Sequence, residues 1–152
     1  MGYVLATALL AVPHFLQPAF AQAVPYTMVG DSVFESLSSS AGNPIKGRAI
    51  VLSRQTGLCI LCHSGPFSDE PFQGNLAPNL SISVASMTAA QLRARLIDSR
   101  SFNPSTIMPS YYRTSDLNRV APKYVGQTIL NAQEIEDAIA FLLTMNSAKP
   151  NE

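Results

Sequence analysis

The sequence predicts one small all-α domain in which a few helices are joined by long irregular loops. Apolar residues recur at helical spacing in segments 92–97 and 135–142, and each stripe follows a helix-capping pattern, at Thr88–Gln91 and Asn131–Glu134. Eleven prolines and eight glycines break much of the remaining chain. At 152 residues, the chain forms at most one ordinary domain.

The charge balance argues against two classes of partner. Ten basic and ten acidic residues give a formal net charge of zero. A protein that binds nucleic acid or an anionic membrane surface is expected to carry a basic excess. We therefore expect neither nucleic acid nor a membrane as a partner of the mature protein.

The first residues have the pattern of a secretory signal peptide. The uncharged apolar run Tyr3–Val12 is too short to span a bilayer, and small residues then allow cleavage after Ala21 or Ala23. The pattern predicts an exported protein. The chain is then expected to divide into four parts: a signal peptide (1–23) that is removed, an N-terminal arm (24–44), a domain (45–147) and a tail (148–152).

Both cysteines and one of the two histidines lie in a single motif. Residues 57–63 read GLCILCH, and the C-x-x-C-H pattern of Cys59, Cys62 and His63 is the attachment signature of haem c. Each thiol forms a thioether with a haem vinyl group, and one helical turn leaves the next side chain, the His63 imidazole, directed at the iron. Export agrees with this chemistry, because oxidising conditions belong to the bacterial periplasm. We therefore expect an all-α domain wrapped around one covalently bound haem.

Three other interpretations of the cysteine pair are weaker. A disulfide across two intervening residues closes a short loop and contributes little entropic stabilisation. A thioredoxin-like redox pair requires a βαβ context, and no alternating strand pattern surrounds the motif. A structural zinc site requires four ligands, and the chain has no second cysteine pair.

Local patterns near the motif suggest how the site is supported. Residues Lys46–Arg54 read as a helix running up to the motif, with Gly47, Ile50 and Val51 as its packing face. We expect the terminal helix to cross this one. A haem-ligating histidine usually donates its other ring nitrogen to a carbonyl, and Pro78, in the following loop, is the candidate acceptor, with a plain loop proline as the equal alternative.

Two arginines of the 92–97 segment have two possible roles. Arg93 and Arg95 lie within reach of a haem propionate by their place in the chain. A solvated helix face is the favoured interpretation of both.

The second iron ligand is expected to be a methionine. His14, the other histidine, leaves with the signal peptide, so a bis-histidine haem is excluded and a methionine, an unusual ligand or an open site remains. Thioether ligation suits a haem of raised potential. Met87 and Met108 are the candidates, and Met108 is favoured because prolines at 104 and 109 stiffen its backbone. A haem with histidine and methionine ligands has no open position, which favours electron transfer over oxygen chemistry.

Beyond these patterns, the chain resembles the class I c-type cytochromes, and more closely the SoxX family, the small monohaem subunits of SoxXA cytochromes. The resemblance spans about residues 43–145. It is carried by four segments: Gly57–His63, Gln73–Pro78, Asn103–Tyr111 (NPSTIMPSY) and Ile129–Leu143.

The resemblance implies a class I cytochrome c fold and a periplasmic heterodimer with a SoxA-like subunit. In that family the complex joins thiosulfate to a cysteine of a SoxYZ-like carrier protein, an L-cysteine S-thiosulfotransferase reaction. By residue match, Cys59 and Cys62 carry haem c, while His63 and Met108 bind its iron. This subunit accepts electrons and passes them to a soluble cytochrome c, and no activity is expected from it alone.

Two other functions share the same haem site. A free-standing, diffusible monohaem cytochrome c needs the same ligands but no catalytic partner. A haem-based gas sensor requires an open or easily displaced sixth ligand.

Overall fold

Four α-helices and three short 3-10 helices make up the ordered elements of the computed structural model, which describes residues 23–146 apart from the side chain of Lys123. No strand occurs within this range. The predicted signal peptide, except for Ala23, and the whole of the predicted tail lie outside the described residues. The elements are α1 (Pro44–Leu52), η1 (Cys59–Leu61), α2 (Leu80–Ser83), α3 (Ala89–Asp98), η2 (Ser99–Ser101), η3 (Pro122–Tyr124) and α4 (Ala132–Leu143).

Helix α1 begins two residues earlier than the sequence pattern predicts. The side chain of Asn43 accepts hydrogen bonds from the N–H groups of Ile45 (2.9 Å) and Lys46 (3.2 Å), and Pro44 occupies the first helical position. The helix also ends two residues earlier, because Ser53 is extended (ψ 126°). The predicted range Lys46–Arg54 was therefore shifted by two residues.

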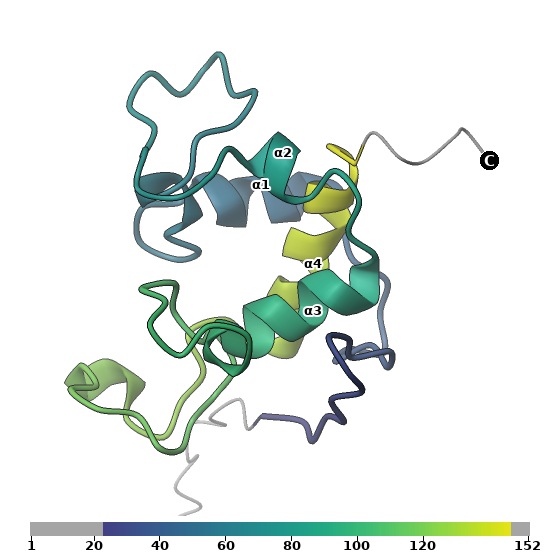
Figure 1. Cartoon of the computed structure of the whole chain (residues 1–152), viewed down its shortest axis with the longest axis vertical. Coiled ribbons are helices and arrows are strands. Elements are labelled where there is room, and N and C mark those ends of the chain that lie inside the picture. Colours follow the sequence, from purple (N-terminus) through teal and green to yellow (C-terminus); the bar gives the residue numbers. More distant parts are fainter. Residues whose placement is uncertain (1–22, 147–152) are drawn as a thin grey trace, which may run out of the picture.

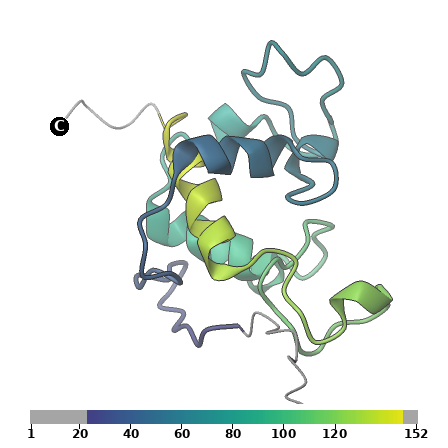
Figure 2. The same cartoon turned by 180° about the vertical axis from the view of Figure 1, so that it is seen from behind.

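Helices α1 and α4 cross and pack together, as expected (Figures 1 and 2). Gly47 lies at the crossing, where a Cβ would come within 1.9 Å of the carbonyl oxygen of Asp137. The absence of a side chain at Gly47 therefore allows the two backbones to approach closely.

Helices α3 and α4 both begin with the predicted capping boxes. In α3, Thr88 Oγ1 accepts from the N–H of Gln91 at 3.2 Å, while Gln91 Oε1 accepts from the N–H of Thr88 at 3.0 Å. Asn131 and Glu134 make the same exchange in α4, at 2.9 and 2.8 Å. The predicted apolar stripes are buried: Leu92, Leu96 and Ile97 in α3, and Ile135, Ala138, Ile139 and Leu142 in α4.

The N-terminal segment, residues 23–43, packs on α3 and α4. Val33 (0% exposed) and Leu37 (5% exposed) belong to the hydrophobic core. The N–H of Val33 donates to the carbonyl of Ala90, and the N–H of Leu37 donates to Glu136. The segment expected to be an arm therefore contributes to the packed core.

Arg93 is not part of a solvated helix face, and the sequence-based interpretation of this residue was wrong. Its side chain is 7% exposed and forms a paired hydrogen bond with the Glu136 carboxylate, at 2.7 and 2.8 Å. It also donates to the Val33 carbonyl at 2.7 Å. Arg95 is partly buried, with its guanidinium 4.9 Å from the centre of the Phe102 ring. Neither arginine is freely solvated.

None of the helices in the described range is long and apolar enough to cross a lipid bilayer.

Candidate functional site

The C-x-x-C-H motif folds as one tight helical turn. Cys59 begins η1, and its carbonyl accepts hydrogen bonds from the N–H groups of Cys62 (3.1 Å) and His63 (2.9 Å). Leu58, just before the turn, has a φ of 62°, which is uncommon for a residue with a side chain. Ile60 is fully buried and fixes the turn in the core. The turn therefore has the compact shape that the motif predicts.

The two cysteines are free thiols rather than a disulfide. Burial raises the pKa of the Cys59 thiol, and its hydrogen bond with Tyr111 only partly offsets this effect. Neither sulfur is used in a disulfide between the two cysteines.

The loop after the motif returns alongside it. The N–H groups of Gly74, Ala77 and Leu80 donate to the carbonyls of Ile60 (2.8 Å), Cys62 (2.9 Å) and Ser64 (2.8 Å), respectively. A Cβ on Gly74 would lie 2.2 Å from the Leu61 carbonyl oxygen. Glycine at position 74 therefore permits the close approach that these bonds require.

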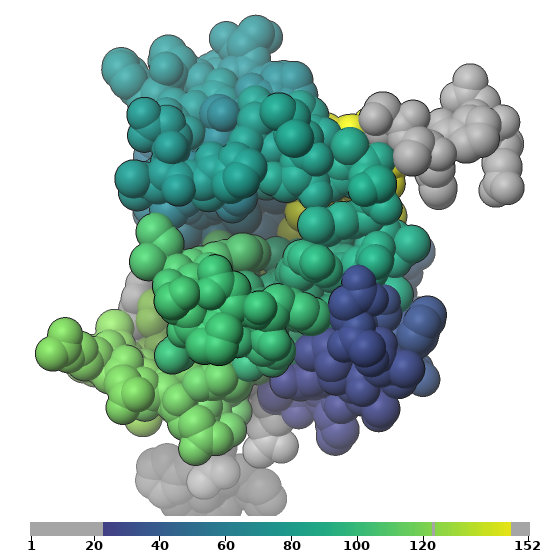
Figure 3. Space-filling view, in the orientation of Figure 1, coloured from purple at the N-terminus to yellow at the C-terminus, as the bar shows by residue number. Residues whose placement is uncertain are grey.

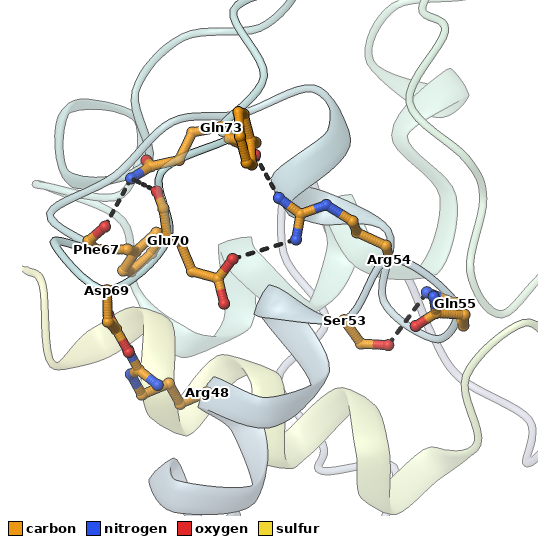
Figure 4. Close-up of polar contacts among 9 residues, drawn as sticks. Arg48, Ser53, Arg54, Gln55, Phe67, Asp69, Glu70 and Gln73 are labelled. Carbon is orange, nitrogen blue, oxygen red and sulfur yellow. Dashed lines mark hydrogen bonds and ion pairs between the residues drawn. The ribbon is translucent and has the colours of Figure 1, made fainter.

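Polar side chains hold the same loop together and tie it to the end of α1 (Figure 4). The amide of Gln73 accepts from the N–H of Gly65 at 2.7 Å and donates to the carbonyls of Phe67 (2.8 Å) and Glu70 (2.9 Å). Arg54, just after α1, pairs with Glu70 at 3.2 Å and donates to the Phe72 carbonyl. This long loop is therefore anchored despite its prolines.

The predicted partner of His63 is confirmed. His63 Nδ1 lies 2.7 Å from the carbonyl oxygen of Pro78. Because a carbonyl can only accept, Nδ1 carries the proton and donates it. The bond therefore directs Nδ1 to the backbone and leaves Nε2 as the nitrogen that can bind a metal.

The Met108 segment is fixed by bonds to its backbone on both sides. The N–H of Met108 donates to Thr106 Oγ1 at 3.1 Å, and its carbonyl accepts from Ser99 Oγ at 2.9 Å. Three residues later, the N–H of Tyr111 donates to the carbonyl of Leu96 in α3 at 3.0 Å. This irregular stretch is therefore rigidly attached to α3.

Tyr111 connects the Met108 segment to the cysteine motif, a role that the sequence did not reveal. Its hydroxyl donates to the carbonyl of Gly57 at 2.6 Å and lies 3.9 Å from Cys59 Sγ. The phenol is 2% exposed, and burial raises its pKa far above the ordinary value. Tyr111 therefore acts here as a neutral hydrogen-bond donor.

The cysteine motif, the loop after it and the Met108 segment all contribute residues to the lining of an apolar cavity of about 500 Å³. Figure 3 shows the molecule hollowed between the surface formed by the loop after the motif and the surface around the Met108 segment. The lining includes Cys59, Cys62, His63, Met87 and Met108, whereas Met28 and Met145 are not part of it. Leucines, valine, isoleucine and prolines form most of the remaining wall.

The donor set fits a haem. A cavity of this size and apolar character suits a large flat cofactor. It offers two thiols for thioethers, an imidazole with a fixed tautomer and two thioether sulfurs, the ligand types that c-type haem iron takes. The fold and this cavity define a class I c-type cytochrome.

A search of protein-family models and a search of curated proteins found no match for this chain. A search of solved structures found a chain in the crystal structure of SoxXA from P. pantotrophus, with a TM-score of 0.72 and 32% sequence identity. The alignment covers 80% of this chain and 94% of that chain. The protein belongs to the SoxX family of cytochromes.

Proposed function

We propose that the protein is the electron-transfer subunit of a periplasmic thiosulfate-oxidising complex, an L-cysteine S-thiosulfotransferase. In this role it accepts electrons from a SoxA-like subunit and passes them to a soluble cytochrome c. The observation that carries the proposal is the cavity lined by both the C-x-x-C-H motif and Met108, in a chain 32% identical to a chain of SoxXA.

Four residues are assigned to the cofactor. Cys59 and Cys62 would hold haem c through thioether bonds, and Nε2 of His63 and the sulfur of Met108 would bind its iron. Haem c supplies one-electron exchange between ferrous and ferric iron, and a thioether ligand favours the ferrous form. The Pro78 carbonyl orients His63 and increases the electron density on its ring.

Met108 is preferred to Met87 as the axial ligand, although both line the cavity. The Met108 segment is joined to the cysteine motif through the hydroxyl of Tyr111 and the carbonyl of Gly57. That bond sets the position of Met108 relative to the attached cysteines. Met87 instead follows α2, and its carbonyl accepts from the side chain of Asn146, just after the C-terminal end of α4.

Under this proposal the sequence has no further cysteine for the sulfur chemistry. Both thiols are used in haem attachment under this proposal, and the iron has two protein ligands. We therefore expect the complex's activity to require the SoxA-like subunit and a SoxYZ-like carrier. The isolated protein should exchange electrons and catalyse nothing.

Absorption spectra test the ligand assignment. The reduced protein should give a low-spin c-type spectrum, and the oxidised protein a weak methionine-to-iron band at long wavelength. Met108→Leu should abolish this band, while the matched variant Met87→Leu should retain it. Loss of the band in Met87→Leu alone would reassign the axial ligand to Met87, and a high-spin wild-type spectrum would favour a gas sensor.

Copurification tests the partner. Co-expression with a SoxA-like protein should yield a stable heterodimer that oxidises thiosulfate in the presence of a SoxYZ-like carrier. A chain that remains monomeric beside such a partner, yet reduces a soluble cytochrome c, is a free-standing electron carrier.

A further inference from the structure

Arg95 places a positive charge on an otherwise apolar wall. Among the described residues that line the cavity, it is the only lysine, arginine, aspartate or glutamate. Ser83 and Thr106 contribute uncharged hydroxyl groups to the same lining, and Thr106 already accepts from the N–H of Met108. Arg95 is thus a cationic side chain on a lining that is otherwise apolar or uncharged.

The contacts of Arg95 leave its hydrogen-bonding capacity largely unused. None of the described carboxylates lies within ion-pair distance of it, in contrast to Arg93, which is paired with Glu136. Its guanidinium donates one long bond, 3.4 Å, to the carbonyl of Gln91 on its own helix. The Phe102 ring, 4.9 Å away, supports the flat group without using its N–H donors.

A guanidinium at such a position calls for an anion. Filling the cavity with an apolar macrocycle removes water from Arg95, and a desolvated charge is costly unless it is paired. The planar fork of arginine matches a carboxylate with two parallel hydrogen bonds. Haem carries two propionate carboxylates.

We propose that Arg95 binds a propionate of the haem and thereby raises the reduction potential of the iron. The proposal rests on the presence of haem in the cavity. Arg95 is a positioning residue for the cofactor's acidic edge, and Phe102 holds its guanidinium in place. Its positive charge neutralises the propionate and disfavours the additional positive charge of ferric iron.

Other titratable groups near Arg95 are few. Asp31, on the N-terminal segment, is influenced by the charge of Arg95, but it is exposed and bonded to Gln91, which lowers its pKa. Around the cavity, Cys59 and Cys62 are attached to haem under the proposal, His63 is bonded to Pro78, and Tyr111 is neutral. A pH-dependent potential in the weakly acidic range therefore reports on the propionate.

Redox titration of Arg95→Gln tests the proposal. We expect a fall in the reduction equilibrium constant of up to about tenfold, equivalent to about 59 mV for one electron. Without the arginine, the propionate's pKa rises, so the potential of the variant should also increase as the pH is lowered from neutral, where the wild type stays nearly flat. The matched control is Arg100→Gln, which removes the same charge from an exposed residue that does not line the cavity.

Two outcomes overturn the proposal. One is a potential and pH profile of Arg95→Gln that coincide with those of Arg100→Gln, because a purely structural arginine changes stability and not the potential. If Arg95→Gln yields no haem-loaded protein, the variant Arg95→Lys tests the proposal instead. The propionate bending band in its resonance Raman spectrum should shift relative to the wild type. An unchanged band is the second contradicting outcome. Failure of the proposed function is distinct, because copurification with a SoxA-like partner and thiosulfate oxidation measure it, and a free-standing haem-loaded cytochrome would still show the effect of Arg95.

Discussion

Replacing Arg93 by methionine should destabilise the protein far more than removing an exposed arginine. The side chains of Arg93 and Glu136 are each 7% exposed and are joined by two hydrogen bonds of 2.7 and 2.8 Å. Arg93 also donates to the Val33 carbonyl at 2.7 Å. Arg93→Met therefore leaves a buried carboxylate and a carbonyl without their partner.

The magnitude follows from the cost of an unpaired buried charge. Removing one member of a buried ion pair costs about 3–5 kcal/mol. Glu136 keeps its hydrogen bonds from the N–H of Leu37, at 2.9 Å, and from the side chain of Ser36, so the lower end of that range applies. For a chain of this size, about 3 kcal/mol corresponds to a fall in Tm on the order of 10 °C.

The same pair predicts a pH dependence. Burial alone would raise the pKa of Glu136, but the bonds from Arg93 and from the N–H of Leu37 outweigh it and lower that pKa below its ordinary value of 4.5. A lowered pKa in the folded state stabilises the protein fully above the ordinary value, and the stabilisation is lost as the pH falls through the folded pKa. Glu136→Gln should therefore weaken the dependence of stability on pH below about 4.5.

Thermal unfolding of the haem-loaded protein, followed by far-ultraviolet circular dichroism, measures these effects. The matched control is Arg48→Met, because the Arg48–Asp69 pair is 42% and 60% exposed and should matter little. The double variant Arg93→Met/Glu136→Met should recover part of the loss, since it removes both charges. Equal Tm values for Arg93→Met and Arg48→Met would refute this reasoning.

Three further substitutions test close contacts. Gly47→Ala should lower stability by about 1–3 kcal/mol, because its methyl carbon would lie 1.9 Å from the Asp137 carbonyl oxygen; an unchanged unfolding curve contradicts this. Gly74→Ala places a methyl carbon 2.2 Å from a carbonyl of the cysteine motif and should reduce the fraction of protein that carries haem, measured by pyridine haemochrome absorbance; full loading contradicts this. Tyr111→Phe leaves the Gly57 carbonyl without its 2.6 Å donor and should cost about 1–3 kcal/mol in denaturant unfolding; a midpoint equal to that of the wild type contradicts this.

Matched controls separate these effects from general damage. Gly126→Ala has open space around the new methyl group, so it should cause only the backbone strain of its positive φ (70°) and leave haem loading unchanged. Tyr112→Phe removes a hydroxyl that accepts a hydrogen bond from the N–H of Val24, away from the cysteine motif. It should not change the haem spectrum.

The features that the sequence predicts well depend on neighbouring residues. The capping boxes at Thr88 and Asn131 use residues three positions apart, so the pattern is readable directly. The carbonyl of Pro78, 15 positions after His63, could be named as a candidate acceptor, with a plain loop proline as the equal alternative, because a ligating imidazole needs an acceptor and a proline-rich loop follows it. Local chemistry explains each of these successes.

The features that the sequence does not predict depend on distant partners. Arg93 looks like a surface residue until Glu136, 43 positions later, is brought beside it. Val33 lies in a polar segment without periodicity, and its burial follows from contacts with α3. Tyr111 could be placed in a motif, but its bond to Gly57, 54 positions earlier, required the fold.

Helix α4 has a mechanical role that follows from its contacts with both α1 and α3. Helix α1 leads into the cysteine motif, which forms one wall of the cavity. Helix α3 carries the bonds that fix the Met108 segment, which forms the opposite wall. Because α4 packs against both helices, it sets the separation of the two walls. Ala138, 2% exposed on α4, does not line the cavity. Ala138 belongs to the hydrophobic core, so a larger side chain there should disturb the packing of α4 without entering the cavity. In this architecture, the redox properties of a cofactor between the walls are open to tuning by residues that never touch it.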